Sequence, residues 1–204
     1  SGIASSKLLP LGIYTVKETT APTNYGLNPN TFTADLEFAG QVVQIQVTDP
    51  SITTGVTIKK TGYQQVMNNS LIRYTVSNVA NTSSVSLNSF YWRDTIPTDA
   101  MRLTRLVTGT YSATQNYKVT YTTNLNSNWQ TAYDNLSTAQ NYTLDMSASA
   151  LGLASNEYVT SFMLVFGIVP SGFHQLTDAT VDGTTLYALT NGYQFTNKAD
   201  VGGL

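Results

Sequence analysis

The stretch FYWRDTIP, at residues 90–97, places an acidic side chain on an aromatic face. Alternate side chains of an extended strand point to the same side, so Asp94 shares its face with Phe90 and Trp92. If that face lies in a hydrophobic core, the Asp94 carboxyl is buried with it, and an unpaired buried carboxylate is costly. The pattern therefore predicts either that Asp94 lies beyond the end of the strand or that another polar group meets it inside the protein.

Two further segments carry one polar side chain on an otherwise apolar face. In VTIKK, Lys60 shares its face with two aliphatic side chains, whereas Lys59 points the other way. In YQFTNKADV, Asn197 alternates with aromatic and aliphatic side chains. We therefore predict that Lys60, Asp94 and Asn197 meet in one core.

An amine, a carboxylic acid and a carboxamide are the groups that an isopeptide bond between lysine and asparagine requires. Burial favours the neutral forms of both the amine and the acid. In an apolar core, the neutral Lys60 amine can attack the Asn197 side-chain carbonyl while a protonated Asp94 polarises it and transfers protons, and ammonia leaves. This reaction occurs once within one chain, so the pattern does not predict an enzyme.

Other residues remain as alternatives for each role. A β-bulge that shifts the register would make Lys59 the amine donor, and Asn191 is a second candidate acceptor. Glu157 or Asp145 is an alternative acid. Ordinary interpretations also exist, because a lysine can extend to solvent at a sheet rim and an aspartate before Thr-Ile-Pro can begin a turn.

The elements that must position these side chains are β-strands along the whole chain. Runs rich in β-branched and aromatic residues, such as VVQIQV, LIRYTVSN and YVTSFMLVFG, alternate with turn signals such as NPN and VPSG. This spacing predicts an all-β fold containing a β-sandwich. A short helix is expected over residues 145–154, and TDATVDGTT is expected to form a turn that includes Asp182.

The segment TDPSITTG, at residues 48–55, combines Pro, Gly and hydroxyl side chains between two strong strands and predicts a domain boundary. We expect a first domain over residues 1–50 and a second over residues 53–204. The first is too short to make a robust independent domain. No signal peptide is recognisable, so the chain is expected to come from inside a longer precursor.

Composition argues against several functional classes. Charged residues make up 11% of the chain, and a net charge of −2 without a basic block argues against nucleic acid and against an anionic membrane. The absence of cysteine excludes disulfides and thiolate metal sites, and the one histidine, His174, follows a turn, so neither a metal nor another cofactor is predicted. A polar, Thr-rich and cysteine-free β protein is typical of the outside of Gram-positive cells.

Residues 9–27, LPLGIYTVKETTAPTNYGL, carry an ordered set of motifs. A Leu-Pro-x-Gly turn leads into a Tyr-x-x-x-Glu strand, and a Thr-x-Ala-Pro segment and a Tyr-Gly turn follow. In this order they resemble the collagen-adhesin B-type domain, also called SpaA-like or prealbumin-like, although Tyr25-Gly26 reverses the usual Gly-Tyr. The resemblance covers residues 1–50 and implies a partial prealbumin-like β segment.

Many domains of that family form an intramolecular isopeptide bond, and the resemblance implies roles for two acids in this chain. Glu18 matches the family's proton-shuttling glutamate, and Asp49 stands where the acceptor is usually found. The lysine donor belongs to the family's first strand, which has no counterpart upstream, and Lys7 is wrongly placed for it. We therefore expect a truncated domain without its own crosslink; the alternative for Glu18 is an ordinary surface glutamate.

Residues 53–204 contain, in order, the segments VTIKKTG, LIRYTVSNVANTSS, WRDTIP, LVFGIVPSGF and YQFTNKADVGG. In this order they resemble the immunoglobulin-like domains of Gram-positive pilins and of the collagen-adhesin A-type region. The resemblance implies an immunoglobulin-like β-sandwich of about 150 residues that serves as a stalk or pilin-like module of a cell-wall surface protein. Its expected partners are neighbouring domains of the same protein. The alternative is an adhesin tip that binds a host glycan or protein through residues 108–156, which include Trp129.

Overall fold

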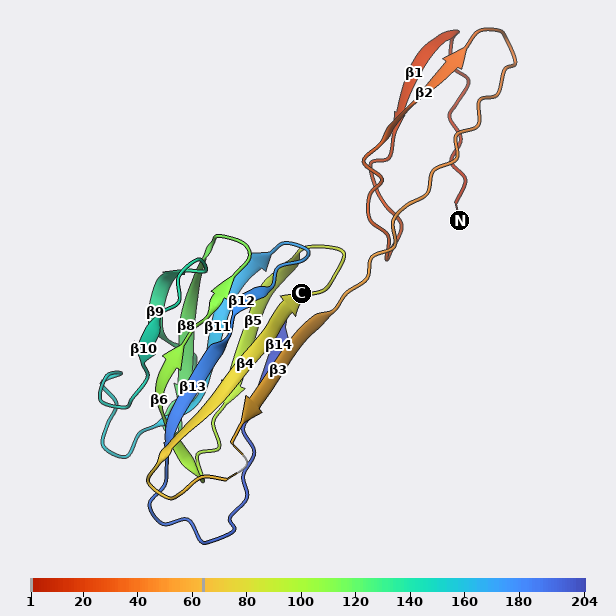
Figure 1. The fold of residues 1–204 in the computed structure, drawn as a ribbon. Helices are drawn as coiled ribbons and strands as arrows, with labels where there is room; N and C mark the ends of the chain where they lie inside the picture. Colours follow the sequence, from red (N-terminus) through yellow and green to blue (C-terminus); the bar gives the residue numbers. More distant parts are fainter. Residues whose placement is uncertain (1, 64) are drawn as a thin grey trace. The chain divides into compact units, whose positions relative to one another are not determined.

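The computed structural model describes residues 2–63 and 65–204 (Figure 1). The chain divides into two compact units, Ser1–Thr53 and Thr54–Leu204, and each unit has its own set of strands. Among the described residues, no helix is long and apolar enough to cross a membrane.

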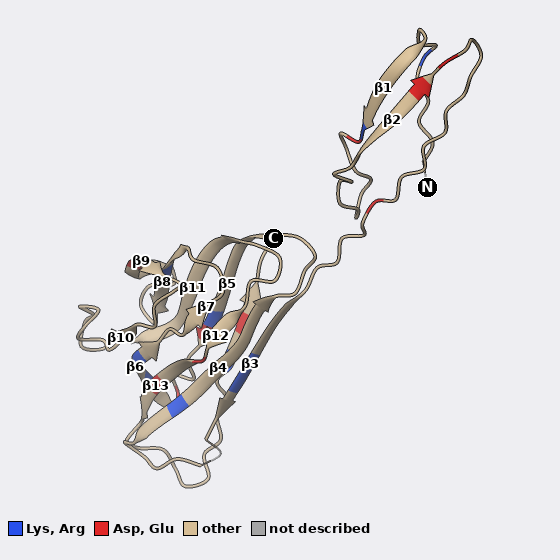
Figure 2. Ribbon diagram, turned by 45° about the horizontal axis from the view of Figure 1, so that its top comes forward, with Lys and Arg blue, Asp and Glu red and all other residues tan. Residues whose placement is uncertain are grey.

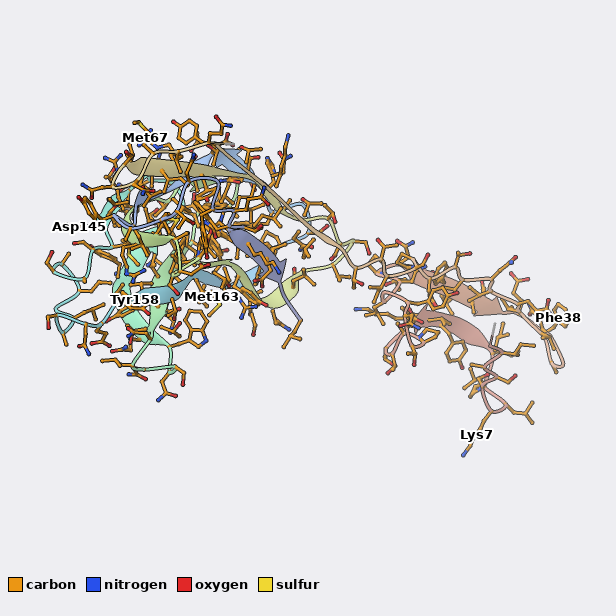
Figure 3. The ribbon with its side chains drawn as sticks, turned by 90° about the horizontal axis from the view of Figure 1, so that it is seen from below. Lys7, Phe38, Met67, Asp145, Tyr158 and Met163 are labelled. Carbon is orange, nitrogen blue, oxygen red and sulfur yellow. The ribbon has the colours of Figure 1, made fainter. Side chains whose placement is uncertain are left out.

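The first unit contains one antiparallel ladder, in which β1 (Gly12–Lys17) pairs with β2 (Thr31–Leu36). The VVQIQV run, expected to be a strand, forms no ladder within the described chain. A two-stranded ladder covers little apolar surface, so many large apolar side chains of this unit stay exposed, including Phe38 (Figure 3).

The second unit consists of two five-stranded antiparallel sheets, which confirms the predicted all-β sandwich (Figure 1). The first sheet has the order β10-β6-β13-β4-β3 and the second the order β14-β5-β11-β8-β9. Strands of the first sheet are β3 (Val56–Gly62), β4 (Leu71–Asn81), β6 (Met101–Val107), β10 (Thr143–Asp145) and β13 (Ala179–Thr185). Strands of the second sheet are β5 (Leu87–Thr95), β8 (Asn116–Thr123), β9 (Gln130–Ser137), β11 (Val159–Val169) and β14 (Lys198–Gly202). A small separate sheet pairs β7 (Thr110–Tyr111) with β12 (Gln175–Thr177).

Side chains of the second unit crowd the space between its two sheets (Figure 3). Trp92 is fully buried, and its ring meets that of Phe162 edge to face with centroids 5.5 Å apart. The indole N–H of Trp92 donates to the Tyr111 hydroxyl at 2.9 Å, and that hydroxyl donates to the Thr108 carbonyl at 3.1 Å. The face of β5 that carries Trp92 is therefore core, and Asp94 lies on the same face.

The prediction of a short helix over residues 145–154 is wrong, because Asp145 ends β10 and residues 148–152 form a turn. One helix-like hydrogen bond runs from the Leu151 N–H to the Ser147 carbonyl at 3.1 Å. Gly152 follows with a left-handed φ of 66°, a conformation that ends a helix rather than continuing it.

Candidate functional site

A lysine and an aspartate from opposite sheets meet inside the second unit. Lys60 of β3 forms an ion pair through Nζ with Asp94 Oδ2 of β5. The Asp94 side chain is fully buried and that of Lys60 is only 10% exposed. Lys60 faces inward because it alternates with Val56 and Ile58 along β3, and all three are partly buried. Among the described residues, no isopeptide bond is seen at this pair.

A bulge lies in the pairing of β3 with β4, and its extra residue belongs to β4. Between Thr57 and Lys59, one residue of β3 opposes two residues of β4, where Asn78 has a φ of 57°. The alternation of β3 is therefore undisturbed. Lys59 is exposed and Lys60 faces the core, so the alternative in which a bulge makes Lys59 the donor has no support in the structure.

Asn197 lies immediately before the last strand, next to the same carboxyl. β14 begins at Lys198, later than the YQFTN pattern suggests, but it pairs with β5 so that Ala199 is opposite Asp94. β14 also runs beside β3 where the edges of the two sheets meet. The structure thus brings the three predicted side chains into one region: Lys60 lies on the first strand of the unit, Asp94 on a middle strand, and Asn197 directly before the last strand.

The Asn197 amide is near Asp94 but is not well aligned with it. The amide helps to lower the pKa of Asp94, after the larger effects of burial, which raises it, and of Lys60, which lowers it. Nevertheless both amide atoms of Asn197, and the Oδ1 atom of Asp94, are buried without a hydrogen-bond partner of normal geometry among the described residues. A buried polar group without a partner costs about 1–3 kcal/mol, so this arrangement is unfavourable unless the amide has another role.

Burial moves the Lys60–Asp94 pair toward its neutral forms. It lowers the pKa of Lys60, against the opposing effect of the Asp94 charge, and it raises the pKa of Asp94. Lys60 Nζ also lies 4.8 Å from the centre of the Tyr74 ring, and burial followed by the Asp94 charge raises the pKa of Tyr74 to about 12. A neutral amine beside a protonated acid is the form in which a lysine is a nucleophile.

The alternative residues have other surroundings. Glu157 accepts a hydrogen bond from the Thr123 hydroxyl, and Asp145 accepts one from the Ser147 N–H at 3.0 Å. Asn191 is exposed in the loop before β14. The acid that meets the inward lysine of β3 is therefore the one on β5.

In the first unit, the two acids that match the family motif are neighbours. Glu18 Oε2 accepts a hydrogen bond from the Asn28 N–H at 2.7 Å, which distinguishes it from an ordinary surface glutamate. Burial, followed by the negative charge of Glu18, raises the pKa of Asp49. Asp49 Oδ1 is buried without a hydrogen-bond partner among the described residues, and Lys7 is exposed and points outward (Figure 3).

The raised pKa of Asp49 gives a prediction for pH. A carboxyl with a raised folded-state pKa stabilises the fold below its ordinary value of 3.8, and this stability is lost as the pH rises through the folded-state pKa. Asp49→Asn removes the ionisation, so at pH 7 we expect the first unit to be more stable in the variant than in the parent. At pH 3 the difference should be much smaller. Urea unfolding followed by the NMR signals of Tyr14 checks this result.

Asp35→Asn is the matched control, since Asp35 is exposed on β2 and its side chain has no ion pair among the described residues. This variant should leave the pH dependence unchanged. If the first unit is more stable at pH 7 in the parent than in the Asp49→Asn variant, the raised pKa of Asp49 beside Glu18 is contradicted.

One charge cluster, formed by two partly exposed arginines around a buried aspartate, is not foreseen by the sequence patterns. Asp182 lies in the central strand β13, not in a turn, and is 1% exposed. Arg73 donates to its two carboxylate oxygens at 2.6 and 2.8 Å, and Arg105 Nε donates to Oδ2 at 2.8 Å. Burial acts to raise the pKa of Asp182, but the two guanidinium groups hold it below its usual value. The turn was expected because Asp-Gly is a strong turn signal; the outward-facing arginines of the two adjacent strands are the signal that could have located the cluster.

Charged positions are otherwise sparse along the ribbon and do not form a block of one sign (Figure 2). Within residues 2–63 and 65–204, no three potential metal ligands come together. The Lys60–Asp94 pair is therefore notable as a buried ion pair whose neighbours are largely apolar.

Comparison with known proteins gives a match for the first unit. Residues 1–51 match the family model of SpaA, the prealbumin-like fold domain, and the second unit has no family match. No curated protein and no solved structure matches the chain. SpaA domains are structural, non-catalytic modules of Gram-positive cell-surface proteins. The first unit is thus similar to a stalk domain of such a surface protein.

Proposed function

We propose that the chain is a stalk or pilin-like structural module of a Gram-positive cell-wall surface protein, whose second unit forms an autocatalytic isopeptide bond between Lys60 and Asn197. The observation that carries this proposal is the buried Lys60–Asp94 pair beside the unpaired Asn197 amide. The SpaA match over residues 1–51 supports the surface location and the structural role. Neighbouring domains of the same surface protein are the expected contacts of this module.

The reaction uses the groups that are already in place. Neutral Lys60 Nζ attacks Asn197 Cγ while protonated Asp94 donates its proton to the carbonyl oxygen. Asp94 then takes a proton from the attacking nitrogen and gives it to Nδ2, and the bond from Cγ to Nδ2 breaks. The former carbonyl oxygen returns its proton to Asp94. One amide bond forms, one ammonia leaves, and Asp94 ends in its starting state.

The surroundings of Asp94 favour this chemistry over competition by water. Asp94 is opposite Phe162 on one neighbouring strand and opposite Ala199 on the other, and Trp92 lies on its own face of β5. Apolar walls keep the amine and acid neutral and hold them near the acceptor in a fixed geometry.

Intact mass spectrometry of the purified chain tests the proposal. We expect a deficit of one ammonia from the sequence mass, and proteolysis should release a branched peptide that joins Lys60 to Asn197. Lys60→Arg and Asp94→Ala should each restore the full mass, because the first lacks the amine nucleophile and the second lacks the proton shuttle. Lys59→Arg is the matched control and should retain the deficit.

A parent chain with the full sequence mass would contradict the crosslink. A deficit of one water would contradict the assigned acceptor, since water is lost when an aspartate such as Asp49 is the acceptor.

For the first unit we propose that Glu18 and Asp49 correspond to the family's proton shuttle and acceptor, in a state without a crosslink. Their proximity and the raised pKa of Asp49 support this assignment. No ion pair between either acid and a lysine is formed among the described residues.

A second candidate function is recognition of a host glycan or protein. It is favoured by the aromatic side chain of Trp129, which is 41% exposed within the polar segment 108–156. Exposed aromatic rings supply apolar contact area for sugars and for proteins. Both functions are compatible in one surface protein.

A further inference from the structure

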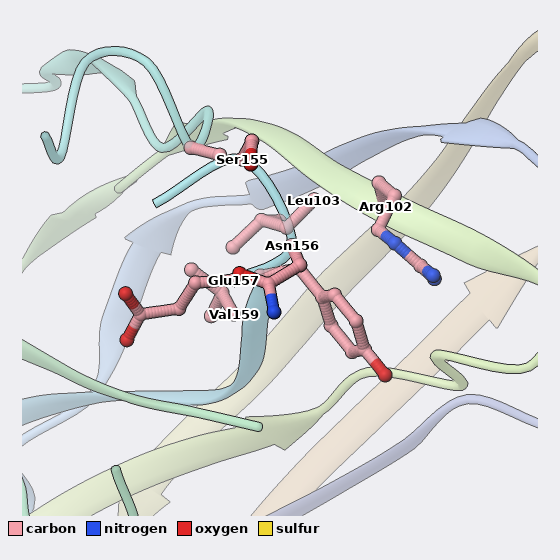
Figure 4. A pocket seen from close by; sticks show the side chains of 8 residues that line it. Arg102, Leu103, Ser155, Asn156, Glu157 and Val159 are labelled. Atoms are coloured by element: carbon pink, nitrogen blue, oxygen red, sulfur yellow. The ribbon is translucent and has the colours of Figure 1, made fainter. Parts of the chain in front are cut away.

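A cavity of about 450 Å³ opens on the second unit, between the start of β6 and the segment that leads into β11 (Figure 4). Its walls include Arg102 and Leu103 of β6, Ala148, and the consecutive residues 155–159. This volume lies within the range of small-molecule pockets in proteins. The cavity is separate from the Lys60–Asp94 pair, since neither residue lines it.

Arg102 differs from the other three arginines of the chain. Arg73 and Arg105 pair with Asp182, and Arg93 pairs with Asp200, whereas Arg102 has no carboxylate partner in the described part of the chain. A fixed guanidinium at the wall of a cavity, with its charge unpaired, favours an anion there.

The guanidinium of Arg102 is held in place by uncharged groups. Its Nη1 donates to the backbone carbonyls of Thr98 and Met101, and its central carbon lies 3.9 Å from the centre of the Tyr158 ring. These contacts fix the position of the group and leave Nε and Nη2 without a hydrogen bond among the described residues. Two adjacent N–H groups of this kind match the two oxygens of a carboxylate.

The opposite wall is also positioned in advance. Asn124 binds both ends of the short turn, accepting from the Tyr158 N–H at 2.8 Å and donating to the Asn156 carbonyl at 3.1 Å. Glu157 points away from Arg102 and is bound to the Thr123 hydroxyl, so it does not neutralise the guanidinium (Figure 4).

The remaining lining is suited to a hydroxylated ring. The Asn156 amide and the Ser155 hydroxyl have no hydrogen bond among the described residues, and each can both donate and accept. Leu103, Ala148 and Val159 supply apolar surface in the same cavity. A sugar ring offers hydroxyl groups at its edge and C–H groups on its face.

We infer that this cavity binds a sugar that carries a carboxylate, with Arg102 binding the carboxylate, and with Ser155 and Asn156 binding ring hydroxyls. The site does not depend on the isopeptide bond. A single sugar with one charged contact is expected to bind with a dissociation constant on the order of 1 mM.

The inference is tested by titrating the ¹⁵N-labelled full chain with glucuronic acid, with glucose and with acetate. Glucuronic acid should shift the backbone NMR signals of residues 102 and 155–158, and glucose and acetate should each bind at least about tenfold more weakly. Arg102→Gln should weaken glucuronic acid binding by about tenfold or more, since it removes a hydrogen bond between charged groups.

Two further variants keep the test decisive. Lys118→Gln removes one charge from an exposed lysine of β8 that has no ion pair among the described residues, and it should leave binding unchanged. Asn156→Ala removes an exposed side chain without a hydrogen bond, so it should fold normally and bind several-fold more weakly. Absence of shifts at this cavity, equal affinity for acetate or glucose, or unchanged binding in both Arg102→Gln and Asn156→Ala would overturn the inference.

Discussion

Asn197→Ala will lower the free energy of unfolding of the second unit by roughly 5 kcal/mol, if the bond closes a loop of roughly 140 residues and stabilises as a chain crosslink does. For a unit of this size, such a change corresponds to a fall in melting temperature of about 10–20 °C. Asn197 is the informative position because the variant keeps both Lys60 and Asp94, which can then pair with each other as in the structure. The measured loss therefore reports the covalent bond and not an unpaired buried charge.

Urea unfolding followed by tryptophan fluorescence is the appropriate measurement, because both tryptophans, Trp92 and Trp129, lie in the second unit. Asn191→Ala is the matched control and should change stability by less than about 0.5 kcal/mol, since Asn191 is an exposed loop residue. If Asn197→Ala unfolds at the same urea concentration as the parent, no stabilising bond exists at this site.

The double variant Arg73→Met/Arg105→Met will destabilise the second unit by about 1–3 kcal/mol at pH 7, because Asp182 loses its charged hydrogen-bond partners while the two arginine side chains are 39% and 44% exposed. Both substitutions remove the cations that pair with Asp182, whose side chain is 1% exposed. The remaining carboxylate would then lack a partner charge, and solvent at the partly exposed arginine positions limits the cost. Urea unfolding at pH 7 checks the magnitude.

The pH dependence distinguishes this effect from lost packing. In the parent, the pKa of Asp182 is lowered, so its contribution is present above the ordinary value of 3.8 and is lost as the pH falls through the folded-state pKa. Without the arginines, burial alone would raise that pKa, and the double variant should regain stability relative to the parent as the pH falls. A deficit that is constant from pH 7 to pH 3 would contradict this account.

Arg93→Met is the control for the double variant. Arg93 pairs with Asp200 at 2.9 Å across neighbouring strands, but both side chains are about 40% exposed. An exposed pair contributes only about 0–1 kcal/mol, so this variant should lose much less stability than the double variant loses. If both variants lose the same free energy of unfolding, the burial of Asp182 does not determine how much stability is lost.

The Lys60–Asp94–Asn197 region illustrates what the sequence can predict. Side-chain parity needs only the two-residue period of a strand, and it places Lys60 and Asp94 on inward faces without knowledge of the topology. The expectation that these side chains come from the first, a middle and the last strand of one domain came from the resemblance of the second unit, for which there is no family match. The sequence alone does not decide whether Lys59 or Lys60 faces the core, because a bulge in β3 or in β4 fits the same sequence. The structure shows that the bulge lies in β4.

Other features could not be predicted from local patterns. The turn expected at Asp182 follows the local signal of Asp-Gly, which is overridden here by pairing of β13 with strands on both sides. The cavity beside Arg102 depends on a turn that Asn124 holds from a distant strand end, and no short motif encodes this contact. In the first unit, the strand propensity of VVQIQV is not sufficient to form a ladder.

The bulge in β4 also bears on how related sequences can vary in length. A residue gained or lost near Asn78 would be accommodated where the strand already departs from regular pairing. An insertion directly after Val56 would instead move every later residue of β3 to the opposite face. Lys59 would then take the inward position of Lys60, at the cost of turning Ile58 outward. Because Lys59 and Lys60 are adjacent, one of the two amines faces Asp94 in either register of β3. The site would therefore keep its lysine after a one-residue insertion.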